Sequence, residues 1–328
     1  MNDSRTTTKQ ERLSEPVTHD ARGVAEEKFS SETEIPCKGR KKTGSKSELP
    51  LKKPKRTRRI VRRCNFLTGK QWIQNSISVW SDIRKMAIDQ TGQHPAIFPI
   101  ALLERLIETF LPVGGEKILD PFCGSGSTLL AAGMKNKTAI GLELSAEYCE
   151  ETLQRLKSLS PEQRSRIVCH EARAQDLLEH TAPTSIDLCI TSPPYWNVLN
   201  RPRSADNKAQ RNYGNLDGDL GLIDRYEDYL EMLSSIFQQV YQALKPGCFC
   251  IVVVMDLRKG KQFYPLHSDL SGKMTDLGFI FDDLIIWNRQ YDYNNLRPLG
   301  FPAVFRVNKV HEYILLFQKP HQQETSTS

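Results

Sequence analysis

The chain has 328 residues, 39% of them hydrophobic, and a formal net charge of +6 at pH 7. This length allows one large domain with a tail or two modest domains, and the positive charge favours polyanionic partners. Apolar runs stay well short of a membrane-spanning length and the N-terminus is too polar for a secretory signal, so no membrane association is expected.

The eight cysteines are scattered along the chain without a Cys-x-x-Cys pair. Most lie in apolar, strand-like runs, where cysteine behaves as a small buried hydrophobe. We therefore expect a reduced cytosolic compartment, with no disulfide framework and no metal site.

The N-terminal 63 residues form a polar tail that becomes basic. Residues 1–50 lack apolar periodicity and cannot bury enough surface to offset the entropy of ordering, so we expect disorder. Residues 38–63 are rich in Lys and Arg, which suits a solvated tail, a phosphate-binding arm or, in a eukaryote, a nuclear-import signal; we favour the arm. Residues 321–328 are expected to form a disordered C-terminal tail, leaving 64–320 as one folded domain.

The first ordered segments precede the central motifs. Residues 66–80 are expected to pack onto the domain, with four apolar side chains near a helical spacing: Trp72, Ile73, Ile77 and Trp80. The sequence His-Pro-Ala-Ile-Phe-Pro at 94–99 leads into a helix predicted at 100–110, whose apolar residues form a single stripe.

Residues 117–128 read Lys-Ile-Leu-Asp-Pro-Phe-Cys-Gly-Ser-Gly-Ser-Thr, which predicts a strand, a glycine-rich turn and the start of a helix that runs to 134. Gly124 and Gly126 permit positive φ and close approach of a ligand to the backbone. No Gly-Lys-Ser/Thr follows, so this is not a Walker loop. An ordinary tight strand-to-helix turn stays open as the alternative.

The next strand is predicted at 139–144 and ends in an acid, Glu143. An acid at a strand tip after a glycine-rich turn is placed to accept hydrogen bonds from ribose hydroxyls. A helix is expected to follow as far as 158, and then a third strand at 166–170 precedes Asp176.

The fourth strand is predicted at 186–190 and stops abruptly at two prolines. A short apolar run ended by prolines is typical of a central strand in a parallel sheet. The prolines can hold Ser192 and the Pro193 carbonyl rigidly at the strand's carboxyl end, where ligands bind in open α/β sheets. An aromatic ring at Tyr195 beside fixed acceptors suits a planar base with an exocyclic amine, although a turn that caps the core has the same pattern.

The remaining chain contains a polar loop at 198–221, helices predicted at 224–244 and 266–277, and strands predicted at 249–255, 279–287 and 311–317. The last two strands are joined without a helix, which implies an antiparallel hairpin at the sheet edge. Alternating strands and helices predict an α/β fold with a mostly parallel sheet and helices on both faces.

These motifs together resemble the DNA amino-methyltransferases, which use S-adenosylmethionine to methylate cytosine N4 or adenine N6. Residues 120–128 are similar to their cofactor loop, 191–196 to their catalytic motif, 94–99 to the segment before the cofactor loop, and 311–317 to their closing strand. The resemblance covers about residues 66–319 and implies the Rossmann-like class I methyltransferase fold, with seven strands and an antiparallel last strand. The cofactor loop precedes the catalytic motif, unlike the commoner order in enzymes with Ser-Pro-Pro-Tyr, and no long insert supplies a separate target-recognition domain.

The resemblance also implies the site residues. The candidate catalytic residues are Ser192, Pro193, Pro194 and Tyr195. The candidate residues for S-adenosyl-L-methionine are His94, Pro95, Phe98, Asp120, Pro121, Phe122, Gly124, Ser125, Gly126, Ser127, Thr128, Glu143, Leu144 and Asp176. Glu143 would bind the ribose and Asp176 would accept from the adenine amino group, with other residues of 171–176 as competitors.

The implied reaction is site-specific methylation of a flipped base in double-stranded DNA. Serine before Pro-Pro-Tyr tends in that family to accompany cytosine, so cytosine N4 is the expected target and adenine N6 the close alternative. An RNA amino-methyltransferase, a protein glutamine methyltransferase and a non-catalytic DNA-binding protein are further alternatives. A cognate restriction endonuclease is a candidate partner, the oligomeric state is left open, and the expected location is the nucleoid in a prokaryote or the nucleus in a eukaryote.

Overall fold

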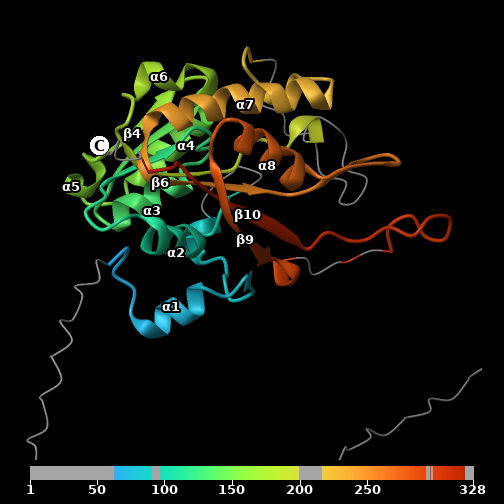
Figure 1. The fold of residues 1–328 in the computed structure, drawn as a ribbon, viewed down its shortest axis with the longest axis horizontal. Helices are drawn as coiled ribbons and strands as arrows, with labels where there is room; N and C mark the ends of the chain where they lie inside the picture. Colours follow the sequence, from blue (N-terminus) through green and yellow to red (C-terminus); the bar gives the residue numbers. More distant parts are fainter. Residues whose placement is uncertain (1–62, 91–96, 199–215, 293–295, 297, 322–328) are drawn as a thin grey trace, which may run out of the picture. The chain divides into compact units, whose positions relative to one another are not determined.

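An eight-stranded sheet organises the part of the chain that the computed structural model describes, which is residues 63–90, 97–198, 216–292, 296 and 298–321 (Figure 1). In sheet order the strands are β1 (Val79–Trp80), β9 (Ile280–Asn288), β10 (His311–Gln318), β6 (Leu244–Val254), β5 (Ile186–Thr191), β2 (Lys117–Asp120), β3 (Thr138–Glu143) and β4 (Ile167–Glu171). Strand β10 is antiparallel to both of its neighbours, and the other pairs are parallel. The predicted fold class, including the reversed last strand, is confirmed.

All seven predicted strands are present, and β1 adds an eighth. This strand pairs in parallel with β9, where Val79 lies in register with Ile286. The sequence predicted that the β9–β10 hairpin forms the edge of the sheet, and this prediction is wrong. Strand β10 lies inside the sheet between β6 and β9, and β1 covers the outer side of β9.

The expectation of one helical stripe over residues 72–80 is wrong. Helix α1 (Gly69–Asn75) begins at a capping box formed by Thr68 and Gln71 and ends after two turns. Beyond it the chain extends into β1, and the Trp80 indole donates a hydrogen bond to the Asn75 carbonyl. Trp80 is buried as expected, but Trp72 is half exposed to solvent.

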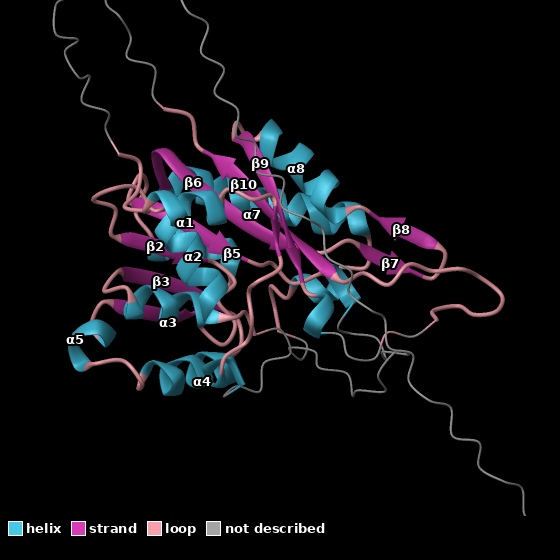
Figure 2. Cartoon of the chain, turned by 90° about the horizontal axis from the view of Figure 1, so that it is seen from below, coloured by secondary structure: helices cyan, strands magenta, loops and turns pink. Residues whose placement is uncertain are grey.

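Helices cover both faces of the sheet (Figures 1 and 2). One face carries α2 (Ile100–Phe110), α3 (Ser127–Met134) and α4 (Ala146–Leu156), whose buried side chains join one core cluster. The other face carries α6 (Leu177–His180), α7 (Tyr226–Ala243) and α8 (Leu266–Asp276), which share the second cluster. The short α5 (Pro161–Arg164) lies before β4 and has no buried residue.

The central strands contribute side chains to both core clusters, because successive side chains point to opposite faces of the sheet. Ile251 and Val253 of β6 belong to the cluster under α2 and α3, whereas Cys250 and Val252 belong to the cluster under α7 and α8. Strand β5 is buried along its whole length. The end of this strand therefore has a fixed position, which matters for the motif that follows it.

Among the described residues, no helix is both long and apolar enough to cross a membrane. The expected disordered tails, residues 1–63 and 321–328, lie almost wholly outside the described residues, as do most of the loop at 198–221 and the residues His94 and Pro95.

Candidate active site

The two central motifs of the sequence meet at the carboxyl ends of β2 and β5, which are parallel neighbours. The Thr191 hydroxyl donates a 2.6 Å hydrogen bond to Asp120 Oδ1, and the Phe122 amide donates to the same oxygen at 3.1 Å. Burial raises the pKa of Asp120 to about 6, although hydrogen bonds from Thr128, Thr191 and the Phe122 amide oppose this. A direct bond thus ties the proline motif to the glycine-rich turn.

Both glycines of the turn adopt left-handed backbone angles, with φ of 53° at Gly124 and 74° at Gly126. A Cβ atom at Gly126 would lie 2.4 Å from Thr152 Cγ2. The Thr152 hydroxyl in turn donates to the Gly124 carbonyl at 3.0 Å. The turn therefore needs positive φ values and is closely packed on α4, and no pattern in the sequence indicated the contribution of Thr152.

A second residue of α4 holds the same turn. Buried Arg155 donates through Nη1 to the Ser125 carbonyl at 2.5 Å and to the hydroxyls of Ser125 and Ser127 at 3.1 Å. Ser125 and Ser127 therefore stabilise the loop on the side that faces α4. An arginine three residues after the buried Thr152, on the inward side of an amphipathic helix, was the available signal for this role.

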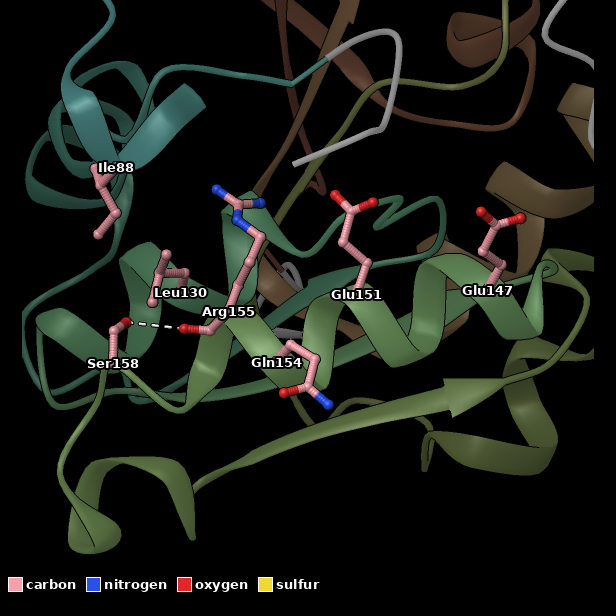
Figure 3. Close-up of a pocket in the computed structure, with 7 residues that line it drawn as sticks. All are labelled: Ile88, Leu130, Glu147, Glu151, Gln154, Arg155 and Ser158. Atoms are coloured by element: carbon pink, nitrogen blue, oxygen red, sulfur yellow. Dashed lines mark hydrogen bonds between the residues drawn. The ribbon is translucent and has the colours of Figure 1, made fainter. Parts of the chain in front are cut away.

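A cavity of about 490 Å³ lies against α4 (Figure 3). It is lined by Ile88, Leu130, Glu147, Glu151, Gln154, Arg155 and Ser158. None of the predicted catalytic or cofactor residues is among them, so this cavity is not the predicted cofactor site.

Replacing Gly126 with alanine should destabilise the fold by about 2–4 kcal/mol, since the left-handed backbone and the collision with Thr152 both add cost. Gly114 is the matched control, because its φ is +84° but nothing lies within 4 Å of the place that a Cβ atom would occupy there. Gly114→Ala should cost only about 1–2 kcal/mol. Urea unfolding measures both, and equal losses would show that Thr152 does not restrict this position.

Glu143 closes the other side of the turn at the end of β3. Its side chain is buried, and its two oxygens accept 2.9 Å hydrogen bonds from the amides of Gly124 and Ser145. Burial raises the pKa of Glu143 to about 7, against the effect of these amide donors. Each carboxylate oxygen keeps a further lone pair for a ligand hydroxyl.

The proline motif is held from several directions. The Pro194 carbonyl accepts from the Tyr229 hydroxyl at 2.7 Å and from the Trp196 amide at 2.9 Å. Trp196 is buried and donates through its indole to the Ile223 carbonyl at 2.7 Å. Within the described part of the chain, no group donates a hydrogen bond to the Pro193 carbonyl, so this acceptor fits the predicted role and the Pro194 carbonyl does not.

Ser192 and Tyr195 lie in a chain of hydroxyl groups that ends on β10. Ser192 Oγ donates to the Tyr195 hydroxyl at 3.4 Å, and that hydroxyl donates to Glu312 Oε2 at 3.2 Å. Arg289 forms an ion pair with the other oxygen of Glu312. Burial, followed by the charge of Glu312, raises the pKa of Tyr195. Glu312 lies in the predicted closing strand, and nothing in the sequence indicated this contact.

Two further predicted cofactor residues, Phe98 and Asp176, already contact other side chains of the protein. Phe98 packs edge-on against Trp287, with 5.8 Å between the ring centroids. The Asp176 carboxylate is held by Arg173 at 2.7 and 3.0 Å, which lowers the pKa of Asp176. Glu171 ends β4 in register with Glu143, so it is an alternative acceptor within the segment that the sequence left open.

A small hairpin beside the proline motif was not predicted. Its strands β7 (Leu257–Lys259) and β8 (Gln262–Tyr264) project from the sheet in Figure 2. Lys259 Nζ lies 4.0 Å from the centre of the Trp196 ring, which links the hairpin to the motif. The described residues provide no acidic ion-pair partner for its three basic residues, Arg258, Lys259 and Lys261.

Comparisons with known proteins concern the family of the chain. A family model described as DNA methylase matches residues 14–154 and 186–327. The chain is 34% identical over 114 residues to the type II methyltransferase M.ScaI of Streptomyces caespitosus, an alignment that covers 33% of this chain and 35% of the relative. It is 42% identical over 76 residues to the orphan methyltransferase M.BamHII of Bacillus amyloliquefaciens, covering 23% and 28%.

These alignments thus span about a third of the length of the curated relatives. Among solved structures, a putative DNA modification methylase from Thermus thermophilus in complex with S-adenosyl-L-methionine is 28% identical. That similarity covers 48% of this chain and 57% of the other, with a TM-score of 0.33.

Proposed function

Since the chain belongs to the DNA methylase family, we propose that it transfers a methyl group from S-adenosyl-L-methionine to an exocyclic amino nitrogen of a base in DNA. The observation that carries this proposal is the hydrogen bond between Thr191 and Asp120, which joins the glycine-rich turn to the proline motif. A methyl donor at the first and an amine at the second would be neighbours, and positioning of two reactants is a large catalytic effect.

The residues around the turn fit the cofactor of this family. Glu143 has lone pairs left for the ribose hydroxyls, and Gly124 carries no side chain that would obstruct a ligand. Phe122 and Leu144 are half-buried apolar residues that are adjacent in sequence to the turn and to Glu143. We propose Glu171 beside Asp176 as the acceptor for the adenine amino group, because Arg173 already engages Asp176. When bound, S-adenosylmethionine supplies an electrophilic methyl group.

The chain's own residues would prepare the amine. Its lone pair is delocalised into the base, so it is a poor nucleophile until the nitrogen becomes tetrahedral. Ser192 Oγ and the Pro193 carbonyl are proposed to accept its two hydrogens and to favour that geometry. The amine would take the methyl group from the sulfonium of bound S-adenosylmethionine, leaving a thioether, and would release to solvent one of the two protons directed at Ser192 Oγ and the Pro193 carbonyl. Tyr195 is proposed to stack on the flipped base.

The proposed target atom is cytosine N4, with adenine N6 as the alternative. The hydroxyl at Ser192 favours cytosine only through the tendency within the family. The deciding experiment incubates the protein with labelled S-adenosylmethionine and genomic DNA and analyses the digested nucleosides by mass spectrometry. N4-methylcytosine is the expected product. N6-methyladenine would overturn the base assignment, and label in neither base would overturn the function.

DNA is proposed to lie across the carboxyl end of the sheet. The loops 198–215 and 288–309 would supply base and backbone contacts, and the basic arm before residue 63 would add sequence-independent phosphate contacts. The β7–β8 hairpin extends this surface next to the proline motif. Lys309 lies over the ring of Phe263 at 4.4 Å, so the hairpin and the 288–309 segment are in contact.

Removing two charges from the hairpin should weaken DNA binding. We expect Arg258→Gln/Lys261→Gln to raise the Kd for DNA at low salt and to make the slope of log K against log salt shallower by about one to two units. The affinity for S-adenosylmethionine should not change. Fluorescence anisotropy across a salt series measures the first effect, and calorimetry measures the second.

The matched control is Lys157→Gln/Arg164→Gln, which removes the same charge near α5. In Figure 2 this helix lies at the far left and the hairpin at the right, at opposite ends of the sheet. The control variant should keep the wild-type Kd and salt slope. If both double variants shift the slope equally, the effect comes from net charge and the hairpin is not a contact surface.

A further inference from the structure

Hydrogen-bonded hydroxyl groups link Ser192 through Tyr195 to Glu312, a residue with no role in the proposed reaction. This hydrogen-bond network crosses from the end of β5 to the start of β10, and its last member, Glu312, is only 4% exposed. Arg289, which follows β9, pairs with the far oxygen of Glu312 and also with Asp292 at 3.1 Å. Three strands thus converge on one buried carboxylate behind the catalytic serine.

A serine hydroxyl is chemically ambiguous, because it can donate its hydrogen or accept one. If Ser192 donated to the substrate amine, it would withdraw the nitrogen lone pair from the reaction. The amine is activated only if the serine oxygen accepts one of its hydrogens. The direction of the serine hydrogen is therefore part of catalysis.

The ion-paired carboxylate of Glu312, the last group in this hydrogen-bond network, determines the direction of the serine hydrogen. An ionised carboxylate can only accept, so the Tyr195 hydroxyl must donate to Glu312 and is left to accept from Ser192. Ser192 then points its hydrogen away from the base and presents its lone pairs. Burial raises the pKa of Tyr195, which keeps the phenol protonated and able to donate.

We propose that Glu312 is a positioning residue that, through the Tyr195 hydroxyl, holds Ser192 as a hydrogen-bond acceptor for the target amine. This inference rests on the proposed amino-methyltransferase function. It gives Tyr195 a second role through its hydroxyl, separate from stacking by its ring. It also assigns Arg289 the task of pairing with this buried carboxylate.

Two variants interrupt the chain at different points. Tyr195→Phe removes the hydroxyl but keeps the ring and the Arg289–Glu312 pair, so it preserves the buried ion pair. Glu312→Gln supplies an amide that can donate to Tyr195 and reverse the chain. Each should lower kcat by about ten- to a hundred-fold, with the Kd for S-adenosylmethionine and for DNA within about twofold of wild type. Glu312→Asp should recover part of the loss.

A double-mutant cycle with Ser192→Ala tests whether the effect passes through the serine. In the Ser192→Ala protein, adding Tyr195→Phe should cause no further loss of the rate constant for methyl transfer, measured in single-turnover methylation of DNA. Losses that multiply would overturn the inference, because Tyr195 and Glu312 would then act independently of Ser192. Tyr195→Phe alone with wild-type kcat would overturn it as well. If the wild-type protein methylates DNA but the losses from Ser192→Ala and Tyr195→Phe multiply, only this inference is overturned and the proposed function stands. An inactive wild-type protein overturns both the inference and the proposed function.

Discussion

Ser192→Ala should lower kcat for DNA methylation by about 10²-fold, the scale seen when one preorganised hydrogen-bonding partner of a transition state is removed. The loss should fall on kcat rather than on binding, because the acceptor matters most as the amine nitrogen becomes tetrahedral. Single-turnover methyl transfer and separate measurements of Kd for DNA and for S-adenosylmethionine distinguish the two effects. Ser192 lies after the buried strand β5 and is only half-buried, so the fold should tolerate the change.

Ser185→Ala is the matched control, because Ser185 stands just before the other end of the same strand and its hydroxyl bonds only to the nearby Ala182 carbonyl among the described contacts. It should leave kcat unchanged. An unchanged kcat for Ser192→Ala as well, or a loss explained entirely by a higher Kd, would remove Ser192 from the catalytic role.

Glu143→Gln should weaken S-adenosylmethionine binding by roughly ten- to a hundred-fold, since hydrogen bonds to a charged group contribute roughly 1.5–3 kcal/mol. The wild-type affinity should also depend on pH. Burial raises the pKa of Glu143 to about 7, so the carboxylate is progressively protonated below that value and loses its capacity as an acceptor. Calorimetry should show affinity falling as the pH drops below about 7, and the variant should lack this step.

The same shift has a defined consequence for stability. The folded-state pKa of about 7 lies above the ordinary value of 4.5, so the native state binds more protons than the unfolded state between these values. The stabilisation from the neutral form is present below pH 4.5 and is lost as the pH rises through about 7.

Glu147→Gln is the control for the affinity measurement, because Glu147 is an exposed acid at the same strand–helix junction. It should change neither the affinity for S-adenosylmethionine nor the pH dependence of that affinity.

The strands and long helices could be predicted from the sequence because their signals are local. The apolar run of β5 between a turn and two prolines, and the apolar stripe of α2, each lie within a dozen residues. The glycine-rich turn and the acid at Glu143 were likewise found as candidates from neighbouring residues. The backbone angles at Gly124 and Gly126 are those that glycine alone adopts without strain.

Contacts between distant segments could not be predicted in this way. Thr191 and Asp120 are 71 residues apart, and Tyr195 and Glu312 are 117 residues apart. The position of Arg155 on the inward side of α4 indicates that it is buried but not which turn it holds, and Tyr229 beneath Pro194 carries no local sign of its partner. The two-residue strand β1 is too short to show a periodicity, and it exists because β9 offers an edge to pair with.

The sequence by itself therefore determined the class of fold, the two motifs and their order along the chain. Only the tertiary structure decided which polar groups complete them. The reason is physical: a strand or turn is selected by interactions among neighbours, whereas the direction of the Ser192 hydroxyl depends on a buried carboxylate from another strand. That carboxylate reaches the serine because β10 is inserted beside β6, with β5 on the other side of β6.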